Sequence, residues 1–237
     1  MSKLTAVLLP GIDGTGRMFG PLMDCLPDWI TPQVINYPTQ QVVDYAQLTT
    51  YVIDRLPNEQ PFFIVAESFA GPLALKVSER QPAGLCAMVL VCTFVTNPRP
   101  WLSLLGRPLI NDWILSFKPR RWMAKLFVTG FDISEEMLQR AFAIHELVSP
   151  TVLRHRLYDV FRVDVRNIYQ ATRTPVLHLY AKHDHLILKS STRQLQQLRP
   201  DIRSVAVDGP HYLLQTKPQA CVEEIVPFIK GVVPPAE

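Results

Sequence analysis

Residues 64–72 read IVAESFAGP and place one serine, Ser68, among small residues. The residues before it, 62–66, form a short apolar run after a proline, which is typical of a fully buried strand. Residues 73–78 then begin an amphipathic helical pattern. A strand that turns directly into a helix strains the residue at the junction, and small neighbours make that conformation tolerable. We therefore expect the Ser68 hydroxyl to be accessible at the carboxyl end of a strand, with a helix N-terminus behind it.

Short apolar runs alternate with helical stretches over most of the chain. Six of these runs are strand candidates, at residues 6–9, 33–37, 62–66, 88–92, 176–180 and 204–207. This alternation predicts an α/β fold with a mostly parallel sheet of about six strands and helices on both faces. Open sheets of this kind bind their ligands at the carboxyl ends of the strands.

The alternation stops in residues 97–172, where only helical segments such as 133–147 and 150–161 are found. Ser149 and Pro150 fit an N-cap followed by proline at the first helical position. An insertion between two strands leaves the sheet at the end that carries Ser68, so we predict a helical cap or lid. The expected division is a first core part at 1–96, the cap at 97–172 and a second core part at 173–237.

Serine alone is a weak nucleophile at neutral pH, so a base and an orienting acid are needed elsewhere in the chain. The last two predicted strands are followed by Asp184 and His211, on the sheet edge that carries Ser68. The order Ser, Asp, His is that of hydrolases with a strand–serine–helix elbow. Asp208 is the alternative acid because it is closer in sequence to His211.

A tetrahedral intermediate also needs two hydrogen-bond donors for its oxyanion. We expect the backbone N–H of Phe69, directly after the serine, to be one of them. The other is expected from Ile12, in the glycine-rich loop PGIDGTG at residues 10–16. Loss of one such donor typically costs roughly 3–4 kcal/mol of barrier lowering. This loop lacks the lysine and the glycine spacing of phosphate-binding loops.

Four segments, in this order, resemble motifs of the α/β-hydrolase superfamily: LPGIDGTG the oxyanion loop, AESFAG the nucleophile elbow, AKHDHLI the acid turn and DGPHYLLQTKP the histidine loop. The resemblance implies a cofactor-independent serine hydrolase in which Ser68, Asp184 and His211 are catalytic. The short N-terminus is similar to that of compact bacterial carboxylesterases. The oxyanion loop and the elbow also resemble those of plant phytyl ester synthases, which are acyltransferases.

The leading hypothesis is a serine carboxylesterase acting on a small-molecule ester with an apolar acyl group. Acyl transfer to an alcohol and a non-catalytic binding protein of the same fold are the alternatives. Strand alternation should turn Glu67 away from Ser68 into a structural hydrogen bond. His183 and His185 flank Asp184 but point apart, so we expect no metal site.

Composition excludes several other classes of protein. The 237 residues carry a net charge of +3, which does not indicate a nucleic-acid partner. The run near the N-terminus reads as a first strand and not as a signal peptide, and no stretch approaches the roughly 18 apolar residues of a membrane span. Four scattered cysteines favour a reducing compartment, and we expect a cytoplasmic protein.

The first part of the predicted cap is rich in tryptophan and in basic residues. Residues 97–130 contain six basic residues and one acidic residue. The same segment contains Trp101, Trp113 and Trp122. Contact with a membrane surface is one interpretation of this composition. The favoured interpretation is that the tryptophans pack the cap onto the core while the charges stay solvated.

Overall fold

The computed structural model describes residues 3–58, 60–101, 112 and 134–233. Six strands form one sheet in the order β2-β1-β3-β4-β5-β6. All five neighbouring pairs are parallel, as the sequence predicts. The strands are β1 (Leu4–Leu9), β2 (Ile30–Val34), β3 (Phe62–Glu67), β4 (Leu85–Val91), β5 (Val176–His183) and β6 (Arg203–Pro210).

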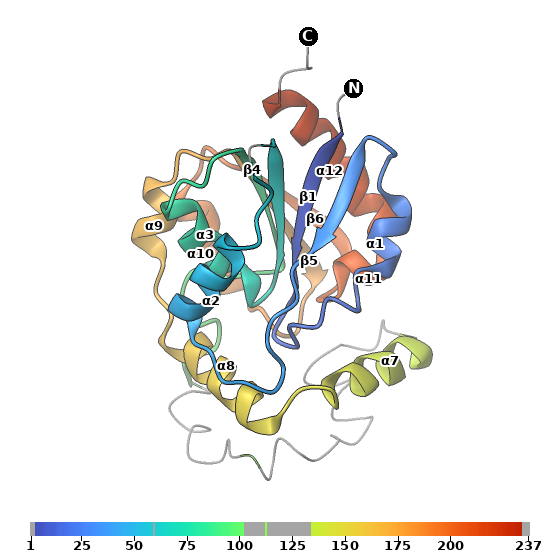
Figure 1. The fold of residues 1–237 in the computed structure, drawn as a ribbon, viewed down its shortest axis with the longest axis vertical. Coiled ribbons are helices and arrows are strands. Elements are labelled where there is room, and N and C mark those ends of the chain that lie inside the picture. The colour runs from blue at the N-terminus through green and yellow to red at the C-terminus, as the bar shows by residue number, and fades with distance from the viewer. Residues whose placement is uncertain (1–2, 59, 102–111, 113–133, 234–237) are drawn as a thin grey trace.

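Helices cover both faces of the sheet (Figure 1). One face packs against α2 (Tyr45–Ile53), α3 (Ala70–Glu79), α9 (Arg166–Ala171) and α10 (Lys189–Leu198). The other packs against α1 (Gly20–Cys25), α11 (Leu213–Thr216) and α12 (Pro218–Val232). Two apolar cores therefore lie on either side of the sheet, and β3 and β4, in its middle, contribute buried residues to both.

The predicted second strand is displaced along the chain. Residues 33–37 were expected, whereas β2 spans Ile30–Val34 and includes Pro32. Proline is tolerated there because β2 is an edge strand, with a partner on one side only. Ile35 and Tyr37 are buried, but the Tyr37 N–H donates to the carbonyl of Gly14, at 2.7 Å. The Ile35 N–H still donates to the carbonyl of Leu8 in β1, at 3.1 Å, so the chain leaves the sheet after Ile35 and Tyr37 bonds to the loop after β1.

Two helices of the predicted cap lie at the end of the molecule opposite the chain termini (Figure 1). They are α7 (Glu135–His145) and α8 (Pro150–Arg162), close to the predicted helical segments. Ser149 does precede α8 and Pro150 does begin it, but the Ser149 side chain makes no capping hydrogen bond. Of the three tryptophans in the basic segment, Trp113 and Trp122 lie outside the described residues, and Trp101 is 52% exposed.

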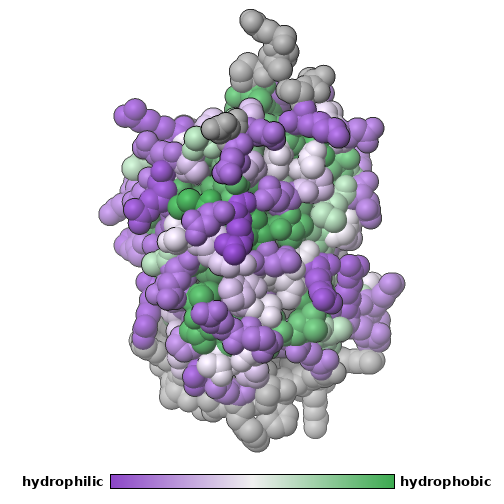
Figure 2. Space-filling view, in the orientation of Figure 1, coloured by the Kyte–Doolittle hydropathy of each residue, from purple (hydrophilic) through white to green (hydrophobic). Residues whose placement is uncertain are grey.

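The surface and the cysteines add two observations. Figure 2 shows mostly hydrophilic residues on the visible face, with small apolar areas between them. In the described part of the chain, no helix combines the length and the hydropathy that crossing a bilayer requires. All four cysteines are free thiols, and Cys92 and Cys221 are buried.

Candidate active site

Ser68 lies in the tight turn between β3 and α3. Its φ angle is +54°, in the left-handed region that residues with a side chain rarely adopt. Its N–H donates to the carbonyl of Val91, at 2.9 Å, and its carbonyl accepts from the Thr93 hydroxyl, at 2.5 Å. The strained conformation expected at this junction is therefore present, and hydrogen bonds with Val91 and Thr93, at and just after the end of β4, fix the backbone of Ser68 in it.

The elbow requires glycine at one of its small positions. A Cβ atom on Gly71 would lie 2.0 Å from Thr93 Oγ1 and 2.7 Å from Thr93 Cβ, which no side chain can occupy. Ala66 and Ala70, by contrast, are accommodated with no exposed surface. The sequence AESFAG therefore keeps its glycine where the first turn of α3 crosses the end of β4.

The three predicted catalytic side chains meet at the carboxyl edge of the sheet. His211 Nε2 lies 3.0 Å from Ser68 Oγ, and His211 Nδ1 lies 2.8 Å from Asp184 Oδ2. The other carboxylate oxygen, Asp184 Oδ1, accepts from the N–H groups of Leu186 and Ile187, both at 2.8 Å. The carboxylate is thus fixed on both oxygens, and the imidazole bridges acid and hydroxyl.

Asp184 and His211 each shift the pKa of the other toward the charged form. Burial alone would raise the pKa of Asp184, but His211 and the two amide donors lower it below its ordinary value. Burial alone would lower the pKa of His211, but the charge and hydrogen bond of Asp184 and the charge of Glu67 raise it. The site therefore favours an imidazole that accepts a proton readily beside an ionised carboxylate.

The alternative acid lies elsewhere. Asp208 is exposed, and its Oδ1 lies 3.0 Å from Nε2 of His183, not near His211. The other histidine beside Asp184, His185, accepts a hydrogen bond from the guanidinium of Arg99 through its backbone carbonyl. The structure therefore assigns the acid contact of His211 to Asp184.

Among the described residues, one group of side chains has the spacing of metal ligands. It consists of Cys92, Asp184 and His211, with ligand atoms within 4.8 Å of one another. The Asp184 and His211 atoms are already engaged in their own hydrogen bond. Burial raises the pKa of the Cys92 thiol well above its ordinary value, which opposes the thiolate that a metal would need. The group fits a structural thiol beside an acid–base pair better than it fits a metal centre.

The two expected oxyanion donors belong to segments that border Ser68. Phe69 is the N-cap of α3, and Ile12 lies in the loop after β1. A Cβ on Gly11, the residue before Ile12, would be 3.9 Å from Ser68 Cβ, so this loop runs directly beside the serine. Within the described part of the chain, the N–H groups of Ile12 and Phe69 have no hydrogen-bond partner. Both are therefore available to a ligand.

A pocket opens at Ser68. The loop after β1, helix α7 and the turns after β5 and β6 line it. Its lining is mixed: Met18, Ile144 and Leu186 are apolar, whereas Asp13, Glu67, Ser68, His145 and His211 are polar or charged. A residue of the predicted cap, Ile144 on α7, thus borders the same space as the serine.

The sequence predicts a structural hydrogen bond for Glu67 but not its place in the lining of the pocket. Glu67 makes the expected structural hydrogen bond, from Gln215 Nε2 to its Oε2 at 3.1 Å, but it also lines the pocket. Strand alternation holds at this position, because Glu67 lies on the same face of β3 as Phe63 and Val65 and bonds to Gln215 in α11. Burial raises the pKa of Glu67 to about 7, although His211 and Gln215 oppose the shift. A carboxylate directly before the nucleophile, in a strand otherwise free of charge, is the signal that could have identified it.

Comparison with known proteins identifies the family. Residues 33–205 match the family described as serine aminopeptidase, S33. The chain belongs to the S33 family of α/β-hydrolases. This S33 chain is therefore a hydrolase, with the fold that the four motifs predict. No curated protein matches its sequence.

Solved structures share the fold of the S33 chain at low sequence identity. A hydrolase from Oleispira antarctica has a TM-score of 0.82 at 14% identity, covering 97% of this chain and 92% of its own. A lipase-esterase related protein from Clostridium acetobutylicum has a TM-score of 0.76 at 15% identity, covering 96% and 95%. A thermophilic esterase from Thermogutta terrifontis has a TM-score of 0.76 at 14% identity, covering 98% and 91%. At these identities the likeness establishes the fold alone.

Proposed function

We propose that this S33 hydrolase is a serine carboxylesterase. The observation that carries the proposal is the chain of contacts from Ser68 Oγ to His211 Nε2, at 3.0 Å, and from His211 Nδ1 to Asp184 Oδ2, at 2.8 Å. In this arrangement Nδ1–H donates to the carboxylate, which leaves Nε2 free to accept the serine proton.

The reaction proceeds through an acyl-enzyme. Ser68 Oγ attacks the ester carbonyl carbon while its proton moves to His211 Nε2. The N–H groups of Ile12 and Phe69 stabilise the oxyanion, and His211 then donates the proton to the departing alcohol. Water, deprotonated by His211, attacks the acyl carbonyl and releases the acid and Ser68. Asp184 keeps the imidazole in the required tautomer and stabilises its protonated form.

In our proposal α7, from the predicted cap, covers this site, and the acyl group is apolar. The position of α7 beside the pocket supports both statements, since Ile144 lies there with Met18 and Leu186. Apolar lining residues favour an aliphatic or aromatic acyl group, and the carboxyl groups of Asp13 and Glu67 in the same lining disfavour an anionic one. Acyl chain length is then set by the depth of the pocket under α7.

The test uses p-nitrophenyl esters of increasing acyl length and a fluorophosphonate probe. Wild-type protein is expected to hydrolyse the esters and to be labelled at Ser68, whereas Ser68→Ala loses both activities. The matched control is Ser78→Ala, because Ser78 is also buried but its hydroxyl donates to the carbonyl of Leu75 within α3. Labelling of another residue, or undiminished hydrolysis by Ser68→Ala, would contradict the proposal.

Comparison substrates separate the related activities. The family description names an aminopeptidase, so amino-acid p-nitroanilides are assayed beside the esters. A higher kcat/KM for the anilides would replace carboxylesterase by peptidase. Ester formation with an added long-chain alcohol would indicate an acyltransferase, and absence of both ester turnover and fluorophosphonate labelling would indicate a binding protein.

A further inference from the structure

One cationic side chain from the cap segment reaches the core under the catalytic loop. Arg156 lies on α8 and has no exposed surface. Its Nη1 donates to the carbonyls of Ile12 and Asp13, at 2.7 and 2.8 Å, and its Nη2 donates to the carbonyl of Pro38, at 2.9 Å. A single guanidinium therefore binds three backbone carbonyls, two of which belong to the loop after β1.

The loop is shaped around this guanidinium. Gly14 has a φ angle of +70°, and a Cβ there would lie 2.7 Å from Arg156 Nη1 and 2.9 Å from Nη2. The Gly14 N–H donates to the carbonyl of Gly11, at 3.0 Å, which closes the turn. Glycine at this position thus allows the charged group to approach the backbone, and the turn in return directs its carbonyls at the charge.

The same guanidinium is separated from Phe69, the other expected oxyanion donor, by one aromatic ring. Its Cζ is 5.6 Å from the centre of the Tyr37 ring, within range of a cation–π contact. The Tyr37 ring is 6.2 Å from the ring of Phe69, and the Tyr45 hydroxyl donates to the Phe69 carbonyl, at 2.9 Å. Arg156 therefore contacts the Ile12 side of the site directly and the Phe69 side through one ring.

A buried charge of this kind is costly unless it is well hydrogen-bonded. No carboxylate among the described residues forms an ion pair with Arg156, so the three carbonyls carry most of the compensation. Carbonyl oxygens are weaker partners than a carboxylate, but they fix the planes of the peptide groups to which they belong. The Ile12 carbonyl shares its plane with the Asp13 N–H, and the Ile12 N–H belongs to the adjoining peptide group, so fixing the Ile12 carbonyl restricts the direction of the Ile12 N–H through the backbone torsions of that one residue.

We propose that Arg156 is a positioning residue that holds the loop after β1, and with it the Ile12 N–H group, in the geometry that binds an oxyanion. The proposal rests on the function proposed above. It makes α8 a structural part of the active site, because the group that shapes the oxyanion loop comes from the segment inserted between β4 and β5. Arg156 contacts no reacting atom and acts only through the backbone.

Kinetics of Arg156→Ala and Arg156→Lys test the consequence for catalysis. A misplacement of about 1 Å in a catalytic group costs on the order of 100-fold in rate, so kcat for a p-nitrophenyl ester should fall by about that factor with KM little changed. Lysine should recover little, because an ammonium group cannot reproduce the planar fork of donors. The matched control is Arg162→Ala, which removes an exposed positive charge from the end of the same helix.

Chemical rescue separates positioning from general destabilisation. Millimolar guanidinium chloride should restore kcat to Arg156→Ala, whereas sodium chloride at the same ionic strength should not. A stability defect would be worsened by guanidinium, so a rise in kcat has no other simple origin. If Arg156→Ala fails to fold, Arg156→Lys carries the test.

Hydrogen–deuterium exchange of residues 10–16 tests the positioning itself and needs no activity. Exchange in this loop should quicken in the Arg156 variants and remain at the wild-type rate in Arg162→Ala. Unchanged exchange, or a kcat within about threefold of wild type in a folded variant, would overturn the proposal. Wild-type protein that neither cleaves esters nor reacts with fluorophosphonate would instead refute the proposed function, and the exchange result would still decide the role of Arg156.

Discussion

Glu67 and His211 form a buried pair of titratable groups beside the nucleophile. The Glu67 side chain is held by Gln215, and its Oε1 is buried with no partner among the described residues. Its charge contributes to the raised pKa of His211, after the larger effects of burial and Asp184. The protonation of Glu67 should therefore influence how readily His211 accepts a proton.

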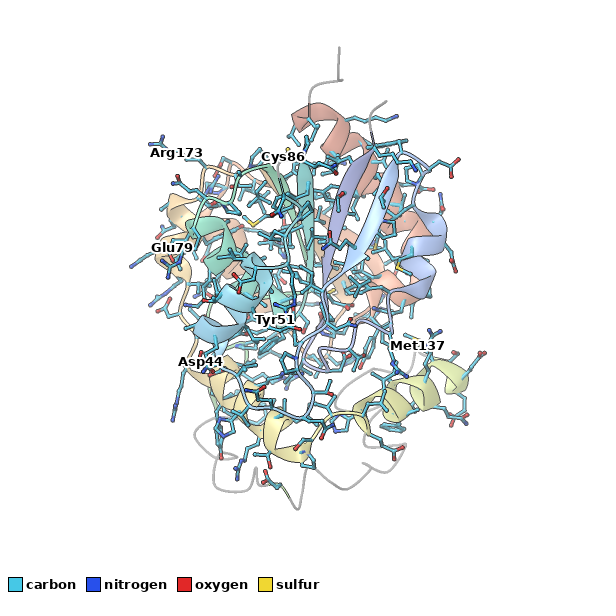
Figure 3. The ribbon with its side chains drawn as sticks, in the orientation of Figure 1. Asp44, Tyr51, Glu79, Cys86, Met137 and Arg173 are labelled. Atoms are coloured by element: carbon cyan, nitrogen blue, oxygen red, sulfur yellow. The ribbon has the colours of Figure 1, made fainter. Side chains whose placement is uncertain are left out.

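The first prediction concerns the pH profile of Glu67→Gln. Removal of the negative charge lowers the pKa of His211, so the acid limb of kcat/KM for ester hydrolysis should move to lower pH. Glutamine is nearly isosteric and its amide oxygen can still accept from Gln215. The matched control is Glu79→Gln on the exposed end of α3, labelled in Figure 3, which should leave the profile unchanged.

The same variant also tests stability. The pKa of Glu67 is about 7 in the folded state against 4.5 ordinarily, so ionisation disfavours folding and stability falls as pH rises between these values. Glu67→Gln avoids this cost, which is roughly 3 kcal/mol at most. Its free energy of unfolding should exceed that of wild type at pH 8 and match it near pH 4. An equal difference at both values would mean that Glu67 does not titrate with folding.

The catalytic side chains could be predicted from sequence, but their supporting residues could not. Ser68, Asp184 and His211 each follow a strand, so topology alone brings them to one edge. The contact between Arg156 and Ile12 spans 144 positions and depends on how α8 packs. The only indication of this role in the sequence was that Arg156 lies on the same face of the helix as the apolar residues Val152, Leu153 and Val160, which are buried.

At the scale of elements, the junction of β3 and α3 depends on the close approach of β4. Gly71 and Thr93 touch where α3 begins, and the Thr93 hydroxyl holds the carbonyl of Ser68, at 2.5 Å. A larger residue at position 71 would separate the two elements and move the serine with them.

The second prediction is that Gly71→Ala damages both stability and catalysis. Overpacking of this kind costs about 1–3 kcal/mol, and displacement of Ser68 should lower kcat on the order of 100-fold. Urea unfolding and ester hydrolysis measure the two effects. Gly231→Ala is the matched control, since Gly231 lies in α12 with nothing within 4 Å of an added Cβ. Alanine there should be neutral or stabilise by up to about 1 kcal/mol. Equal behaviour of the two variants would contradict the packing of the elbow described above.

The bounds of strands were predicted well where the local sequence pattern determines them, and less well where tertiary packing determines them. Residues 62–66 and 176–180 fall inside β3 and β5, because central strands are continuous apolar runs. The edge strand β2 was displaced because it begins three residues earlier than its apolar run, and beyond Ile35, which still bonds to Leu8 of β1, the Tyr37 N–H bonds to Gly14 in the loop after β1. A buried loop and a buried strand have the same composition, so a single sequence cannot separate them.

At the scale of the whole molecule, the inserted segment is joined to the core at several points. Arg156 binds the loop after β1, and the Arg140 guanidinium on α7 donates to the carbonyl of Arg17, at 3.0 Å. On the other side, Asp44 begins α2 close to α8 (Figure 3) and raises the pKa of Asp159. We therefore expect α8 to unfold together with the sheet.

The last prediction uses Asp159 to test this coupling. Burial, and next the charge of Asp44, raise the pKa of Asp159 from 3.8 to about 6, against the opposing effect of Arg162. The folded state thus binds the proton more tightly, and stability contributed by this group is lost as pH rises from about 4 to 6. Asp159→Asn removes the loss, so its Tm should exceed that of wild type above pH 6 and converge with it near pH 4. Partial exposure limits the gain to roughly 1–2 kcal/mol.

The shape of the melting curve carries the information about the whole molecule. One transition, displaced as a unit in Asp159→Asn, means that α8 and the sheet unfold together. Exposed Asp28 provides the control, because Asp28→Asn makes the same chemical change far from α8 in the sequence and should not reproduce the rise in Tm above pH 6 that is expected of Asp159→Asn. Two transitions, of which only the lower moves, would show that α8 melts before the sheet. In that case Arg156 would leave the oxyanion loop before the core unfolds, and ester hydrolysis would be lost at the lower transition while the circular dichroism of the sheet persisted.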